Sequence, residues 1–287
     1  MEDSCLYIVT VATELKYYMK YLIESIEKKN GKLLILGLNQ KWQGFNWRIK
    51  LMINFLQNVK LNDIVCFIDG YDVVCTKDLK LLVSTFKNIK NEKKCKIIVG
   101  NDFVVNPLLR HVQNLFGKCK NKFINAGTYI GYAKDLLDIL QYMHKYNSNN
   151  TADDQILLTN YCISFPHDIY VDIYNDIFLV IGHSFNDLKY KITFENNEII
   201  YNNKFKPFFV HGPGSTYLDY IIKNIGCNHT DKNLIQNQIY KDYWNKKIYD
   251  LIKHHIKEKQ SIILFIIILI IWISYYLTNK IKKTYVK

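Results

Sequence analysis

The sequence predicts an α/β domain with a mostly parallel central sheet, because runs rich in β-branched residues alternate with runs whose apolar residues have helical spacing. The strands are expected at 6–12, 33–37, 64–68 and 96–99, and the helices between them at 15–28, 49–59 and 79–86. This alternation is typical of a sheet covered by helices on both faces. Beyond about residue 150, shorter aromatic runs predict β-rich extensions, at 169–174 and 177–181. A chain of 287 residues with 49% apolar residues is long enough to bury a sizeable core.

The C-terminal part differs from the rest in composition. Residues 261–278 contain no charged side chain and are numerous enough to cross a bilayer, and lysines flank them on both sides. The alternative is a buried core helix, but a water-soluble domain seldom places so uniformly apolar a helix at its end. The sequence therefore predicts four parts: a folded domain (1–245), a basic juxtamembrane segment (246–260), a transmembrane helix (261–278) and a basic tail (279–287).

The charge of the chain is basic but unevenly placed. More than half of the net charge of +12 lies beyond residue 245, beside the apolar segment. The remainder is only mildly basic, which does not indicate a nucleic-acid groove. We therefore expect no nucleic-acid partner and a membrane contact through the C-terminal helix.

The cysteines and the N-terminal residues indicate a compartment. Seven cysteines, without a Cys-x-x-Cys pair, match neither a disulfide framework nor a zinc site, so reduced and buried thiols are expected. The first residues are acidic and lead straight into a strand, unlike a signal peptide. Together with the apolar segment they predict a single-pass protein with a C-terminal anchor, whose folded domain faces the cytosol.

The segment Phe67-Ile68-Asp69-Gly70-Tyr71-Asp72-Val73-Val74 places two carboxylates at the end of an apolar strand. Strand ends of α/β proteins commonly line a binding crevice. Gly70 permits a tight turn, so Asp69 and Asp72 could face one hard cation, and such a cation could neutralise a diphosphate. The alternative is that Asp-Gly is simply a turn after a buried strand.

Six segments occur in an order that matches a known family. They are Thr10-Val11-Ala12-Thr13, Gly37-Leu38 with Trp42, the turn described above, residues 123–133 (FINAGTYIGYA), Ala152-Asp153-Asp154-Gln155, and Val210-His211-Gly212-Pro213-Gly214-Ser215-Thr216. In order and spacing they resemble the N-terminal glycosyltransferase domain of procollagen lysyl hydroxylases, over about residues 5–227. Each motif alone is weak, whereas the ordered set is specific.

The resemblance implies a fold and an activity. The fold is a GT-A-like nucleotide-sugar-binding domain. The activity is metal-dependent transfer of a hexose from a UDP-sugar to a hydroxyl acceptor, such as hydroxylysine of a collagen-like protein. The alternative is a degenerate membrane protein that binds a nucleotide sugar without catalysis. Its support is Tyr217, which stands where the family typically has a lysine facing the diphosphate.

The same resemblance assigns roles to residues. Mn²⁺ would be held by Asp69, Asp72 and His211, and the pair Asp153 and Asp154 would lie near the acceptor and the transferred sugar. The donor-binding residues would be Thr10, Val11, Thr13, Trp42, Arg48, Lys50, Tyr71, Asn125, Gly127, Gly212 and Gly214. Structural alternatives remain open for several of these residues. The acidic pair could cap a helix, Arg48 and Lys50 could line a solvated helix face, and Tyr71 and His211 could merely be packed.

Overall fold

The computed structural model describes residues 4–102, 117–146, 153–181, 191–213, 216 and 218–228. All of the described residues belong to one compact unit within residues 1–240. Within the described ranges, no helix is both long and apolar enough to cross a membrane. The segment predicted to do so, residues 261–278, lies outside those ranges, and so does the juxtamembrane segment.

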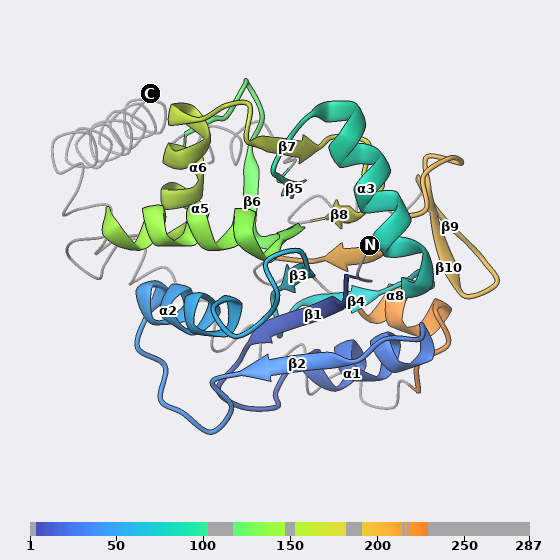
Figure 1. Cartoon of the computed structure of the whole chain (residues 1–287). Helices are drawn as coiled ribbons and strands as arrows, with labels where there is room; N and C mark the ends of the chain where they lie inside the picture. The colour runs from blue at the N-terminus through green and yellow to red at the C-terminus, as the bar shows by residue number, and fades with distance from the viewer. Residues whose placement is uncertain are drawn as a thin grey trace, which may run out of the picture. The chain divides into compact units, whose positions relative to one another are not determined.

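A six-stranded sheet forms the centre of this unit (Figure 1). Its strands, in spatial order, are β2 (Leu33–Leu36), β1 (Leu6–Val11), β3 (Ile64–Ile68), β6 (Ile124–Tyr132), β5 (Ile97–Asn101) and β7 (Ile169–Asp172). Only β6 runs against its neighbours β3 and β5, whereas the β1–β2, β1–β3 and β5–β7 pairs are parallel. The predicted α/β class with a mainly parallel sheet is therefore confirmed.

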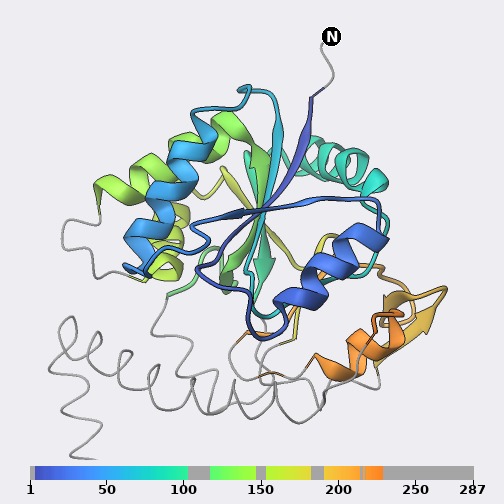
Figure 2. The same ribbon diagram turned by 90° about the horizontal axis from the view of Figure 1, so that it is seen from below.

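Helices cover both faces of this sheet, as Figure 2 shows. On one face lie α2 (Phe45–Leu56), α5 (Ala133–Lys145) and α6 (Asp154–Ser164), and on the other α1 (Met19–Lys28) and α3 (Leu82–Lys93). Alternate residues of β3 supply the two cores: Val65 and Phe67 face the first group of helices, and Cys66 faces the second. Because all five residues of β3 are buried, its C-terminal end is held firmly where the acidic turn begins.

All three predicted helices differ from the structure in their bounds, and the helix expected at 49–59 is α2 (Phe45–Leu56). The first helix begins at Met19 rather than at residue 15, and Leu15 is 61% exposed. The helix expected at 79–86 is a short 3₁₀ turn, η1 (Leu79–Leu81), followed by α3, which continues to Lys93. The spacing of apolar residues locates a helix approximately but does not give the residue at which it begins. Leu15 and Leu81 match that spacing, although both are exposed and precede the α-helices.

A second, three-stranded sheet lies beside the first and carries part of the site. Its order is β4 (Val73–Cys75), β11 (Phe209–His211) and β8 (Phe178–Val180), with β11 antiparallel to β4 and parallel to β8. A hairpin of β9 (Ile192–Glu195) and β10 (Glu198–Tyr201) and the short helix α8 (Asp219–Asn224) pack around a third apolar cluster. The β-rich extension expected beyond residue 150 is thus present.

The cysteines correct one expectation. Cys119 and Cys162 form a disulfide that ties the turn before β6 to helix α6. The expectation that the cysteines form no disulfide framework is therefore wrong for this pair, which lies 43 residues apart in the sequence. Cys66 and Cys75 are free and buried as expected, and burial raises the pKa of the Cys75 thiol to about 12.

Candidate metal centre

Asp69 and Asp72 flank the turn that leads from the large sheet to the small one. Asp69 directly follows β3, and Asp72 directly precedes β4. Gly70 between them is required by close packing, because a Cβ atom there would lie 2.9 Å from Thr10 Oγ1. Both carboxylates are half-buried, with side chains that are 28% and 22% exposed.

The small sheet brings His211 to the same place. His211 ends β11 and pairs with Val73 across the antiparallel β4–β11 ladder, next to Asp72. The Gly212 amide continues the ladder by donating to the Asp72 carbonyl oxygen at 2.8 Å. Strand pairing, rather than the flexible side chains themselves, therefore determines that the imidazole reaches the acidic turn.

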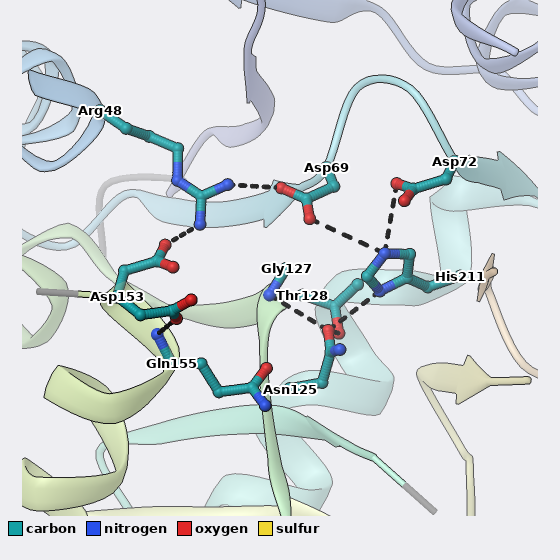
Figure 3. A network of polar contacts seen from close by, with 10 residues as sticks. Arg48, Asp69, Asp72, Asn125, Gly127, Thr128, Asp153, Gln155 and His211 are labelled. Carbon is teal, nitrogen blue, oxygen red and sulfur yellow. Dashed lines mark hydrogen bonds and ion pairs between the residues drawn. The ribbon is translucent and has the colours of Figure 1, made fainter. Parts of the chain in front are cut away.

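The three side chains converge on one point (Figure 3). His211 Nε2 lies 3.2 Å from Asp72 Oδ1 and 3.7 Å from Asp69 Oδ2. The three ligand atoms all lie within 4.8 Å of one another. Neighbouring ligands of an octahedral ion with bonds of about 2.1 Å are about 3 Å apart, so this spacing is compatible with one shared cation.

Asn125, at the start of β6, fixes the orientation of the imidazole. Its Oδ1 lies 2.9 Å from His211 Nδ1 and also accepts from the Gly127 amide and the Thr128 hydroxyl. With three donors around one carbonyl oxygen, Nδ1 is assigned as the N–H donor. The lone pair of Nε2 then points toward the two carboxylates, as a metal ligand requires.

Gly127 leaves the room that an ion needs. Its carbonyl oxygen accepts from the Asp69 amide at 2.8 Å. A Cβ atom on Gly127 would lie 2.4 Å from Asp69 Oδ2 and 2.6 Å from His211 Cε1. Any side chain here would occupy the space between the ligand atoms.

The electrostatics of the site favour a cation. Burial lowers the pKa of His211, but the charges of Asp72 and Asp69 outweigh it, and the pKa is raised above the ordinary value. Asp102, which directly follows β5, adds to the same negative field. Asp102 is not among the residues predicted from the sequence, although an acid just after a strand is the same signal that identified Asp69.

These observations together test whether a metal fits. His211 is 2% exposed, and its Nε2 has carboxylate oxygens close by but no partner with hydrogen-bond geometry. A buried nitrogen without a hydrogen bond is costly, and coordination to a cation would satisfy it. The predicted ligands Asp69, Asp72 and His211 therefore lie together and suit a divalent cation.

Arg48 links this centre to the acidic pair of α6 (Figure 3). Its Nη1 donates to Asp69 Oδ1 at 2.7 Å, and its Nη2 forms an ion pair with Asp154. Asp153 has a structural role instead, because its side chain caps the N-terminus of α6 by accepting a hydrogen bond from the Gln155 amide at 2.8 Å. The two members of the acidic pair thus differ, and only Asp154 belongs to the charged network.

Comparison with known proteins gives the family. The model of the PLOD GT domain matches residues 2–238 of the chain. The chain belongs to the PLOD GT domain family. Its curated relatives are full-length hydroxylases, of which it spans about a third.

Three of these relatives have informative names. A Caenorhabditis elegans "Multifunctional procollagen lysine hydroxylase and glycosyltransferase" is 26% identical over 77% of this chain and 32% of its own length. A Drosophila melanogaster "Procollagen-lysine,2-oxoglutarate 5-dioxygenase" is 27% identical over 74% of this chain and 31% of its own. The Gallus gallus "Procollagen-lysine,2-oxoglutarate 5-dioxygenase 1" is 24% identical over 81% and 34%.

Among solved structures, a glycosyltransferase involved in the glycosylation of the major capsid of PBCV-1 aligns with a TM-score of 0.45 and 12% identity. The alignment covers 77% of this chain and 98% of that one.

The other residues that the family resemblance named as donor-binding lie in different places. Tyr71 Oη accepts from the Thr13 amide at 3.1 Å, which holds the loop after β1 against the acidic turn. Thr10 and Val11 are buried at the end of β1, whereas Trp42 is 43% exposed. Lys50 is exposed on α2, and no polar contact joins it to the metal centre among the described residues. Gly212 borders the centre, and Gly214 and Tyr217 lie outside the described residues.

Proposed function

We propose that this chain is a Mn²⁺-dependent glycosyltransferase of GT-A-like fold. It moves a hexose from a UDP-sugar to a hydroxyl acceptor, such as hydroxylysine of a collagen-like protein. Membership of the PLOD GT domain family supports sugar transfer, and the names of the relatives support a procollagen-type acceptor.

The observation that carries the proposal is the orphaned Nε2 of His211 between two carboxylates, with Gly127 leaving space beside them. A cation bound there would supply positive charge to a diphosphate leaving group. Carboxylate oxygens with one imidazole suit Mn²⁺. A metal-dependent transferase accounts for this arrangement more fully than a purely structural turn does.

The residues of the chain divide the remaining work. Asp69, Asp72 and His211 hold the ion, and Asn125 keeps the imidazole in the tautomer that binds it. Asp154, at the start of α6, lies across Arg48 from Asp69, where it would orient an acceptor hydroxyl or the transferred sugar. Asp153 would support it mainly by capping the helix.

Donor binding would use the surfaces around the same centre. Thr13 and Tyr71 are joined by a hydrogen bond, and the ring of Tyr71 could stack on the uracil or the ribose. Gly127 and Gly212 let backbone approach the sugar and the diphosphate, and Trp42 offers an exposed aromatic face. Gly214 and Lys50 complete the proposed set, as the family resemblance implies.

The test is UDP release by the full chain with UDP-glucose, UDP-galactose and other donors, with and without Mn²⁺. A collagen-like peptide with hydroxylysine serves as acceptor, and the same peptide with lysine is its control. We expect transfer only with metal and the hydroxylated peptide, and loss of transfer in Asp69→Asn and Asp72→Asn. Metal-independent turnover of equal rate would overturn the metal assignment, and equal use of the lysine peptide would overturn the acceptor.

The non-catalytic alternative is not favoured, because the ligand set and Asp154 are both in place. It makes a distinct prediction, namely tight binding of Mn²⁺ and UDP-sugar without release of UDP under any acceptor.

We also propose that residues 261–278 attach the protein to a membrane, as their composition indicates. The full chain should resist alkaline carbonate extraction from membranes, and a chain ending at residue 260 should be released. Protease treatment of intact vesicles tests the side. If the protease digests the folded domain from outside the vesicles, the domain faces the cytosol, as the sequence predicts. The Cys119–Cys162 disulfide is more typical of an oxidising compartment, and a domain on that side would be protected from the protease.

A further inference from the structure

The Arg48 guanidinium already has protein partners on two sides, whereas an arginine that binds phosphate must leave donors free for it. Its side chain is 11% exposed and forms ion pairs on two sides, with Asp69 and with Asp154. Its Cζ also lies 5.2 Å from the Phe45 ring centroid and 5.3 Å from the Phe67 ring centroid. The two ion pairs of the planar fork and these two aromatic contacts together restrict the orientation of the side chain.

This arrangement divides the work of the Asp69 carboxylate. Oδ1 accepts from Arg48 Nη1 at 2.7 Å, whereas Oδ2 faces His211 Nε2 at 3.7 Å and is the oxygen that closes the metal site. Rotation of the carboxylate would require Oδ1 to leave the guanidinium. Arg48 therefore determines which oxygen of Asp69 a metal meets.

The same guanidinium, which belongs to α2, connects the end of β3 with the start of α6. Arg48 belongs to the first turn of α2, Asp69 follows β3, and Asp154 begins α6. The Asp154 side chain is only 10% exposed, so its carboxylate depends on a paired cation. One side chain thus sets the position of a metal ligand relative to the acidic residue opposite it.

We propose that Arg48 is a positioning residue that aims Asp69 Oδ2 at the metal and holds Asp154 in register with it, instead of contacting the diphosphate. The role in transfer rests on the proposed function, whereas the effect on metal binding does not. A hydrogen-bonding partner behind a metal ligand commonly changes metal affinity by about 10- to 100-fold, and the same range is expected here.

The experiment compares Arg48→Lys with Arg48→Met in the full chain, by titrating free Mn²⁺ with electron paramagnetic resonance. Lysine keeps the positive charge but cannot bridge both carboxylates, so Mn²⁺ should bind about 10-fold more weakly or worse. If Arg48 acted only through its charge, Arg48→Lys would bind Mn²⁺ like the wild type and Arg48→Met would bind it more tightly, which would overturn the proposal. Lys32→Met, which removes an exposed charge elsewhere, is the matched control and should leave Mn²⁺ binding unchanged.

Kinetics distinguish positioning from phosphate contact. Positioning predicts that Arg48→Lys lowers kcat about 10-fold or more with little change in the KM for the donor, measured at a temperature at which the variant is folded. An increased Kd for UDP with unchanged Mn²⁺ affinity would instead show a phosphate contact and overturn the proposal. If the wild type transfers no sugar but Arg48→Lys still weakens Mn²⁺ binding, the proposed function fails and the positioning of Asp69 stands.

A second variant covers the case in which Arg48→Lys does not fold. Asp154→Ala keeps Arg48 and all three ligands but frees Nη2 of the guanidinium. Mn²⁺ affinity should fall more in Asp154→Ala than in Asp154→Asn, which removes the same charge but keeps a carbonyl oxygen that can accept from Nη2. Equal Mn²⁺ affinity in these two variants would overturn the coupling.

Discussion

Replacement of Gly127 by alanine tests the metal centre most directly. Gly127 lies within the extended strand β6, whose backbone alanine adopts without strain, so the substitution adds only a methyl group. That methyl carbon would lie 2.4 Å from Asp69 Oδ2 and 2.6 Å from His211 Cε1. Non-bonded heavy atoms pack at about 3.5 Å, so the carboxylate oxygen must retreat by roughly 1 Å.

The expected result of Gly127→Ala is a loss of Mn²⁺ affinity of about 10- to 100-fold, the range that disturbing the groups around metal ligands commonly causes. Overpacking should also cost about 1–3 kcal/mol of folding free energy. Calorimetric titration with Mn²⁺ and chemical denaturation measure the two effects separately.

Gly131→Ala is the matched control on the same strand. A Cβ atom there would lie 2.7 Å from Ile97 Cγ2, in an apolar contact away from the ligands. It should cost a similar free energy of unfolding, about 1–3 kcal/mol, but leave Mn²⁺ affinity near that of the wild type. If Gly127→Ala binds Mn²⁺ with wild-type affinity, or if both variants lose Mn²⁺ affinity equally, the metal does not occupy the space beside Gly127.

Three further outcomes are expected. Asn125→Ala removes the partner of His211 Nδ1, so Mn²⁺ affinity measured by calorimetry should fall about 10- to 100-fold while the protein stays folded. Unchanged Mn²⁺ affinity would exclude an orienting role for Asn125. Burial raises the pKa of Asp172 from 3.8 to about 6, so its contribution to stability is complete below about pH 4 and is lost as the pH rises through 6. Relative to Asp172→Asn, the wild type should lose about 3 kcal/mol over that range in denaturation curves, and parallel curves would contradict the shift. Serine at Cys119 and Cys162 should lower stability by about 2–4 kcal/mol under oxidising conditions only, and an equal loss in reductant would show that no bond had formed.

The sequence predicted most of the large sheet because its strands are buried on both sides. The strand Ile64–Ile68 has the predicted bounds, since an apolar run that ends in an Asp-Gly turn leaves little choice. The reversed direction of β6 was not predictable, because a run of apolar and small residues gives no information about strand direction. Only the pairing of β6 with both β3 and β5 reveals it.

The candidate ligands could be named from the sequence, whereas their supporting contacts could not. Asp69 and Asp72 flank a recognisable Asp-Gly turn, His211 ends an apolar strand before glycines, and the structure brings the three together. The hydrogen bond between His211 and Asn125 joins residues 86 positions apart, and no local pattern encodes it. The Arg48 bridge likewise depends on how α2 and α6 meet over β3, which only tertiary packing decides.

The turn from Asp69 to Asp72 joins two separate sheets, and this gives the cation a structural consequence. Asp69 belongs to the end of a strand in the six-stranded sheet, whereas Asp72 and His211 are held by the three-stranded one. An ion bound by all three would cross-link the sheets, so its binding free energy would also be free energy of folding, about 2.7 kcal/mol at a concentration 100 times its Kd. The amount of folded protein in a cell would then depend on the supply of metal. Distant substitutions that loosen the β4–β11 pairing would lower the metal affinity, and adding metal would restore part of the lost stability.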